Sequence, residues 1–142
     1  MGHDVKKSFT PEIVVMYCNG AVAEDASLPA RVETNEYKAR LVMMPCGSKV
    51  ETYQLLDILA GGADGIQVIA CPEKKCRFLV GNERARKRVE WARKILADID
   101  MGPKRVGLSR GEKLLLDDVK SIAHKRADEV WTLGSNPMKG DK

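Results

Sequence analysis

The chain has 142 residues, and its 24 Lys and Arg against 20 Asp and Glu give a net charge of +4. This length suits one domain with a buried core, and no apolar run approaches the ~20 residues that a bilayer span requires. The start lacks the apolar segment of a secretory signal, and the 5% aromatic content argues against base-stacking surfaces for nucleic acid. We therefore expect a cytoplasmic protein with no membrane span and no nucleic-acid partner.

Four apolar runs are typical of buried strands, and the first three lead into cysteines. The segment from Asn19 to Lys38 gives a weak signal, with room for a short helix. The predicted strands are Glu12 to Cys18, Ala39 to Met44, Ile66 to Ala70 and a less regular one from Arg105 to Leu108.

Three helices are predicted between and after these strands. Two of them follow capping-box patterns, Ser48-x-x-Glu51 and Ser109-x-x-Glu112, in which two side chains satisfy free backbone amides. The first helix is Lys49 to Ala60, the second runs from after Cys76 to about Ile99, and the third follows Ser109. Their expected buried faces are Val50, Tyr53, Leu56 and Leu59; Ala85, Val89, Ala92, Leu96 and Ile99; and Leu115, Val119, Ile122 and Ala123.

The alternation of strands and helices predicts a single-domain α/β fold, flavodoxin- or Rossmann-like. We expect a parallel sheet of about four strands with helices on its faces, formed by residues 12–130. Residues 1–11 are expected to be an N-terminal arm and residues 131–142 a C-terminal tail. Ligands of such sheets bind at the carboxyl ends of the strands. Cys18, Cys46 and Cys71 should share that edge, with Cys76 in the loop above it.

Four thiols that lie close together could have several roles, and the sequence pattern does not decide between them. A 2Fe–2S cluster takes four thiolates from scattered loops, so it fits Cys18, Cys46, Cys71 and Cys76 better than zinc does, because structural zinc sites usually use closely spaced pairs. A zinc-stabilised scaffold, a redox pair of Cys71 and Cys76, and simple burial of the thiols remain alternatives. Basic residues beside the cysteines (Lys49, Lys74, Lys75 and Arg77) would compensate the charge of an anionic cluster.

Other features predict little chemistry. The basic run 83–94 is either a solvated helix face or a docking surface for an acidic partner. Residues 61–65, GGADG, do not form the G-x-G-x-x-G pattern of a dinucleotide loop. No arrangement of catalytic side chains can be argued, so no active site is predicted.

Three stretches resemble the delta (D) subunit family of methyl-viologen-reducing hydrogenase. They are EIVVMYCN (residues 12–19), VMMPCGSKV (42–50) and the long block GGADGIQVIACPEKKCRFLVGNERARKRVE (61–90). The family commonly has additional cysteines in its first motif, at positions that hold Tyr17 and Ala21 here. All four cysteines of this chain would therefore be needed as ligands.

The resemblance implies an iron–sulfur electron-transfer subunit of an oxidoreductase complex, without a catalytic site of its own. It implies one 2Fe–2S cluster, with Cys18, Cys46, Cys71 and Cys76 as the iron ligands. Electrons would pass between a hydrogenase or another dehydrogenase and the flavin and iron–sulfur subunit of a heterodisulfide-reductase-like partner. A small domain with a single cluster is expected to work in a hetero-oligomer.

Overall fold

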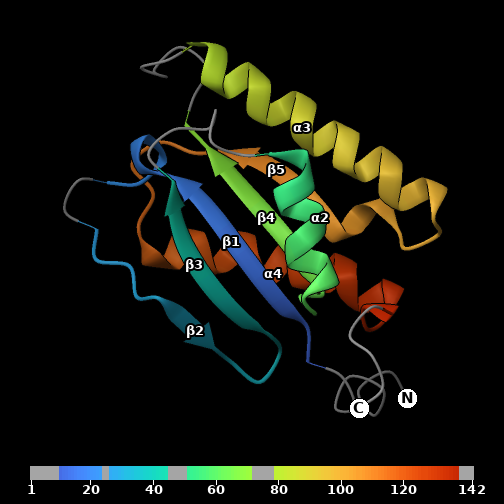
Figure 1. The fold of residues 1–142 in the computed structure, drawn as a ribbon. Coiled ribbons are helices and arrows are strands. Elements are labelled where there is room, and N and C mark those ends of the chain that lie inside the picture. Colours follow the sequence, from blue (N-terminus) through green and yellow to red (C-terminus); the bar gives the residue numbers. More distant parts are fainter. Residues whose placement is uncertain (1–9, 24–25, 45–50, 72–78, 138–142) are drawn as a thin grey trace.

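A five-stranded, mostly parallel sheet lies between helices on both of its faces (Figure 1). The computed structural model describes residues 10–23, 26–44, 51–71 and 79–137, and the elements below are those within these ranges. The strands are β1 (Glu12–Cys18), β2 (Arg31–Glu33), β3 (Lys38–Met44), β4 (Gly65–Ala70) and β5 (Val106–Arg110). The helices are α2 (Thr52–Ala60), α3 (Leu79–Asp98) and α4 (Leu116–Leu133), with short 3-10 turns η1 (Asn19–Ala21) and η4 (Pro103–Arg105).

The strand order is β2-β3-β1-β4-β5, which confirms the predicted α/β fold. The four parallel strands therefore follow the flavodoxin-like order 2-1-3-4, in which the order reverses between β1 and β4. The fifth strand, β2, pairs antiparallel with β3 at one edge. It was not predicted, because three residues in a polar segment show no apolar periodicity.

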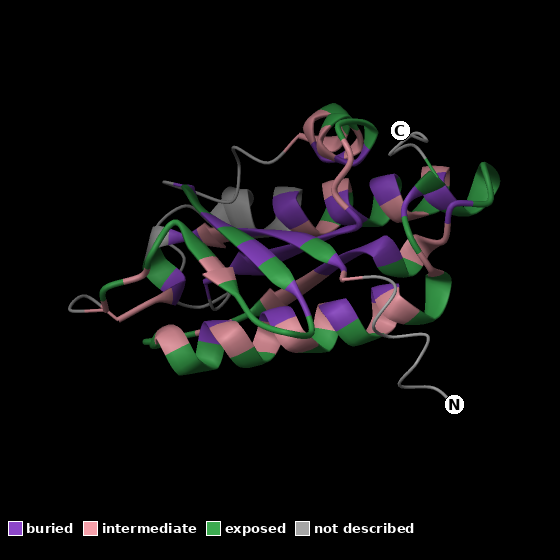
Figure 2. Cartoon of the chain, turned by 90° about the horizontal axis from the view of Figure 1, so that it is seen from below, coloured by how far each residue is buried: buried purple, intermediate pink, exposed green. Residues whose placement is uncertain are grey.

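Two apolar clusters hold the layers together, one on each face of the sheet. On one face, Val119, Ala123, Ala127 and Val130 of α4 pack against β1, β3 and β4. On the other face, Leu55 and Leu59 of α2 and the buried side of α3 pack against β1, β4 and β5. Figure 2 shows buried residues along the sheet and on the sides of the helices that face it. The six residues of β4 are all buried, as expected of a central strand.

Two helices begin later than predicted. For α2 the first helical residue is Thr52, since Glu51 has extended backbone dihedrals and makes no side-chain cap; Ser48 lies outside the described residues. For α4 the predicted capping box is wrong, because Ser109 belongs to β5. The helix is capped at Leu115 instead, whose amide donates to Asp118 Oδ2 at 2.9 Å.

The buried faces of the helices were predicted in part. Ala85, Val89, Ala92 and Leu96 of α3 are buried as expected. Three other assignments are wrong: Tyr53 is 73% exposed because α2 packs through Leu55 and Leu59, Ile99 lies beyond the end of α3, and Leu115 precedes the first turn of α4.

A buried polar network joins both ends of the described chain at the amino edge of the sheet. Arg105 donates to the carbonyl oxygens of Met101, Asp64, Gly134 and Ser135 at 2.8 to 3.3 Å. Asp64 accepts the backbone amides of Glu12 and Asn136. Burial lowers the pKa of Arg105, and the nearby charge of Asp64 opposes that effect. The packed structure thus continues past residue 130, the predicted end of the domain, because α4 reaches Leu133 and Asn136 is buried.

Two arginine side chains donate hydrogen bonds to backbone carbonyl oxygens in or next to the outer strand β5. Arg93 of α3 donates to the carbonyl oxygen of Val106 at 2.8 Å. Arg126 of α4 donates to the carbonyl oxygen of Lys104 at 2.9 Å, just before this strand.

None of the helices in the described part of the chain combines the length and the apolar character that crossing a membrane requires.

Candidate cysteine site at the carboxyl edge of the sheet

Cys18 and Cys71 lie beside each other where the strand order reverses. Cys18 ends β1, and Cys71 directly follows β4. The register pairs Tyr17 with Ile69, so Cys18 stands level with Ala70 and Cys71 is one residue further on. With adjacent strands ~4.8 Å apart and a rise of ~3.3 Å per residue, ideal sheet geometry places the two cysteine Cα atoms about 6 Å apart. Two thiols that are 53 residues apart in sequence therefore meet at the usual ligand-binding edge of this fold.

The turn after Cys18 runs directly against Cys71. A Cβ placed on Gly20, in η1, would lie 3.4 Å from Cys71 Cβ and 3.8 Å from Cys71 Sγ. The third predicted ligand follows the strand on the other side of β1, since Cys18 pairs with Met44 and Cys46 comes two residues later. Cys46 and Cys76 themselves lie outside the described residues.

A short loop closes this edge. After β5, the amide of Gly111 donates to the carbonyl oxygen of Ala70 at 2.9 Å, which keeps the chain against β4. Leu114 then exchanges backbone hydrogen bonds with the segment after η1, donating to Ala21 and accepting from Ala23. Leu114 packs on the cluster that contains both cysteines. A Cβ on Gly111 would lie 2.3 Å from Leu114 Cδ1, so a larger residue here would displace the Leu114 side chain.

The two thiols are accordingly enclosed in apolar surroundings. Cys18 is 4% exposed and Cys71 is 5% exposed. Thiolates in a site that excludes water are suitable ligands for iron–sulfur clusters and for zinc. Both side chains, on adjacent strands, fit half of a four-thiolate site. Among the described residues, which include two of the four predicted cysteines, there is no group of three or more His, Cys, Asp and Glu side chains that could hold a metal.

Positive charge at this edge comes in part from a residue that was not predicted from the sequence. Arg110, the last residue of β5, pairs in register with Ala70, directly before Cys71. A basic residue at the end of the fourth strand was the signal that could have identified it. The basic neighbours that were predicted, Lys49, Lys74, Lys75 and Arg77, lie outside the described residues.

A second group that was not predicted braces β4 beneath the cysteines. Gln67 is 2% exposed in the middle of that strand. Arg126 donates from Nε to Gln67 Oε1 at 2.8 Å, and Gln67 Nε2 donates to Ser109 Oγ at 3.0 Å. Burial lowers the pKa of Arg126, with the charge of Glu129 opposing. The polar Gln67 within an apolar run was the sequence signal, and its hydrogen bonds fix β4, β5 and α4 relative to one another.

The basic run on α3 is partly paired within the chain. Arg86 forms an ion pair with Glu90 at 2.8 Å, and Arg88 contacts Glu51 at 3.5 Å. Lys87 and Lys94 are exposed, and the Lys94 ammonium lies 5.6 Å from the ring centre of Trp91. This agrees with a largely solvated face, while docking of an acidic partner on α3 stays a prediction.

Comparison with known proteins identifies the family. A family model described as "Methyl-viologen-reducing hydrogenase, delta subunit" matches residues 13–134. The chain belongs to this family. The resemblance to the delta subunit family that the sequence motifs indicated is therefore confirmed.

Two kinds of relative match this delta-subunit chain. One is the vhu iron-sulfur subunit of the F420-non-reducing hydrogenase of Methanocaldococcus jannaschii, 26% identical over 129 residues that cover 89% of this chain and 96% of that protein. The other is a subunit of the Ferredoxin/F(420)H(2)-dependent CoB-CoM heterodisulfide reductase of Methanosarcina acetivorans, 29% identical over 136 residues that cover 91% of this chain. The chain spans 17% of the length of that protein, and 17% of its counterpart in Methanosarcina mazei.

Proposed function

We propose that this chain is an electron-transfer subunit that holds one 2Fe–2S cluster on Cys18, Cys46, Cys71 and Cys76. It would relay electrons between a hydrogenase or another dehydrogenase and the flavin and iron–sulfur subunit of a heterodisulfide-reductase-like partner. In this proposal the chain has no active site of its own and works in a hetero-oligomer.

The observation that supports the proposal most directly is the meeting of Cys18 and Cys71 at the point where the strand order reverses. The family adds a second argument, since one relative is named as the iron-sulfur subunit of a hydrogenase and another as a subunit of a heterodisulfide reductase. The four-cysteine composition adds a third, because an all-thiolate cluster then uses every cysteine of the chain.

The residues of the chain have three tasks in this function. Cys18 and Cys71 would present thiolates from the ends of two adjacent strands, and Leu114 of the closing loop packs on the apolar cluster that contains them. Arg110 adds positive charge at the same edge, which tends to raise the reduction potential of an anionic cluster. A bound 2Fe–2S cluster supplies reversible one-electron transfer.

Anaerobic purification followed by iron and sulfide analysis tests the cluster. We expect about two irons and two acid-labile sulfides per chain, a visible absorption, and an EPR signal in the reduced protein. Cys18→Ser and Cys71→Ser should each lose most of the iron. A matched control is Ala21→Ser, which places a hydroxyl at a buried position of the same edge without removing a thiol.

A zinc-stabilised scaffold without a redox role is the alternative, because zinc also takes four thiolates. It predicts about one zinc per chain and no visible absorption. A colourless, iron-free protein whose Cys18→Ser variant behaves as wild type would contradict both the cluster and the zinc site.

A further inference from the structure

On the face with α2 and α3, the sheet is covered unevenly. Both helices pack on β1, β4 and β5, and of β3 only the last residue, Met44, joins their cluster; among the described residues no helix covers the same side of β2 and of the first part of β3 (Figure 1). A hollow of about 440 Å³ lies between these two strands and the last turn of α2. Charged residues of β1, β2 and β3 line it, together with the apolar Val14 and Ile58.

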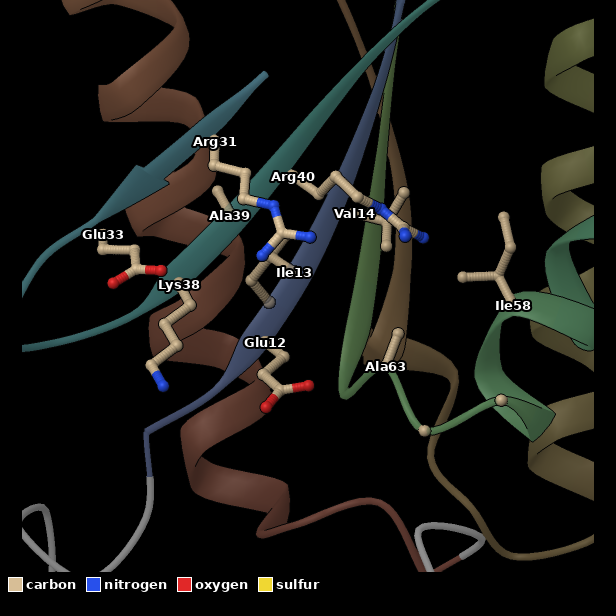
Figure 3. Close-up of a pocket in the computed structure, with 12 residues that line it drawn as sticks. Glu12, Ile13, Val14, Arg31, Glu33, Lys38, Ala39, Arg40, Ile58 and Ala63 are labelled. Atoms are coloured by element: carbon tan, nitrogen blue, oxygen red, sulfur yellow. The ribbon is translucent and has the colours of Figure 1, made fainter. Parts of the chain in front are cut away.

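The strand registers arrange the charges of this hollow in two rows. The lower row places Lys38 between Glu33 on β2 and Glu12 on β1, so its single cation has an acid on either side. The upper row places Arg31 directly opposite Arg40, with the apolar Val14 as the next neighbour. In Figure 3 both arginine side chains extend from β2 and β3 towards β1.

The upper row is therefore a pair of cations without an acid in its own row. Like charges directly opposite each other destabilise an antiparallel pair. Both residues are exposed, and neither guanidinium makes an ion pair with a carboxylate of the described chain. Two guanidinium groups beside the apolar Val14 match a ligand that presents carboxylates next to an apolar side chain, since arginine binds carboxylate in a two-pronged geometry.

We propose that this hollow is a docking site for an acidic segment of a partner protein, with its carboxylates on Arg31 and Arg40. The inference rests on the proposed function in one respect, namely that the chain works in a complex. A protein segment is favoured over a small anion because the matching region is 17% of a much longer chain in two relatives, where it is part of a larger protein. The exposed Val42, two residues after Arg40 on the same face, extends the apolar contact area.

A charge-reversed variant, Arg31→Glu, tests the site because stability and docking should change in opposite directions. Facing Arg40, the new carboxylate replaces repulsion with attraction, so Tm should rise by about 2 °C. The Kd for the partner subunit, isolated anaerobically with the tagged chain and identified by mass spectrometry, should rise at least about tenfold. The matched control is Lys125→Glu, the same charge change at an exposed site of α4 on the opposite face of the sheet, which should leave the Kd unchanged.

Lys38 provides a second readout from inside the hollow. A zero-length carbodiimide should join its ammonium to an Asp or Glu of the partner in the isolated complex, and Arg31→Glu should abolish that intermolecular peptide. Cross-links through Lys87 or Lys94 instead, together with an unchanged Kd for Arg31→Glu, would place the interface on α3 and overturn the proposal. A rise of Tm with citrate that depends on both arginines, without an effect on the complex, would make the hollow a small-anion site and overturn it equally.

The iron content separates this inference from the proposed function. Arg31→Glu should retain the iron of the wild-type chain while it loses the partner. A chain that holds no iron but still docks through Lys38 would refute the cluster and leave the docking site intact.

Discussion

Replacing Arg105 with alanine should remove a large part of the stability of this domain. The guanidinium is buried, with 2% of the residue exposed, and it donates four hydrogen bonds to backbone carbonyl oxygens. These oxygens come from the residues just after α3, just before β4 and just after α4. Removing the donor takes the partner from acceptors in three separate segments, of which those at Met101 and Asp64 are in buried hydrogen bonds.

The magnitude follows from two opposing contributions. Hydrogen bonds from a charged donor contribute ~1.5–3 kcal/mol each, so four would sum to ~6–12 kcal/mol. Burial of the cation opposes this sum, as the lowered pKa of Arg105 indicates. Breaking a buried charged network by removing one partner typically costs ~3–5 kcal/mol, and we expect about 4 kcal/mol for Arg105→Ala. A domain of this size has a free energy of unfolding of ~7–20 kcal/mol, so the loss is a substantial fraction.

Urea denaturation followed by circular dichroism measures this loss. The matched control is Arg86→Ala, which removes one exposed ion pair with Glu90 and should cost less than about 1 kcal/mol. A free energy of unfolding for Arg105→Ala that equals that of Arg86→Ala would refute the reasoning. It would mean that the hydrogen bonds of the buried guanidinium only offset the free-energy cost of its desolvation.

Two further predictions concern Gly107 and Tyr37. A Cβ on Gly107 would lie 1.8 Å from Arg126 Nη2, so Gly107→Ala should displace that side chain and cost ~1–3 kcal/mol in thermal unfolding, whereas Gly61→Ala, with its nearest atom at 3.5 Å, should cost little. An equal effect of the two substitutions would contradict the packing argument. Burial, and secondarily the charge of Glu36, raises the pKa of Tyr37, so alkaline ultraviolet titration should show a tyrosine that ionises above the free value of ~10 and is absent from Tyr37→Phe. Because the folded pKa is the higher one, the contribution of Tyr37 to stability is complete below the unfolded value of ~10 and is lost as the pH rises through the folded value. A titration curve that Tyr37→Phe leaves unchanged above that value would contradict this.

The fold could be predicted because its central strands are buried on both sides. Continuous apolar runs identified β1 and β4 within one residue of their observed bounds. The strand β2 could not be predicted, since its pairing depends on the register with β3 rather than on its own three residues. The start of α4 was placed too early because Ser109-x-x-Glu112 has the form of a capping box, while Ser109 is held in β5 by pairing with β4 and by Gln67.

For the candidate site, the sequence predicted only that the cysteines lie at the same edge of the sheet. Strands that end in cysteine place Cys18 and Cys71 at one edge once the sheet is parallel, and the structure brings these two together. That β1 and β4 are adjacent in the sheet could not be predicted, because the strand order is not encoded in any local sequence pattern. The closing loop at Gly111 and Leu114 was missed for the same reason, because its partners are backbone atoms of residues that are distant in sequence.

The two outer strands have a consequence for assembly. At one side β2 has three residues, and Arg31 and Glu33 are charged and exposed. At the other side Arg93 occupies the carbonyl oxygen of Val106 in β5. Short, charged or side-chain-bound outer strands resist the addition of a further strand. Neighbouring subunits should therefore join this chain through side chains, so that single substitutions on its surface can change one contact without altering the sheet.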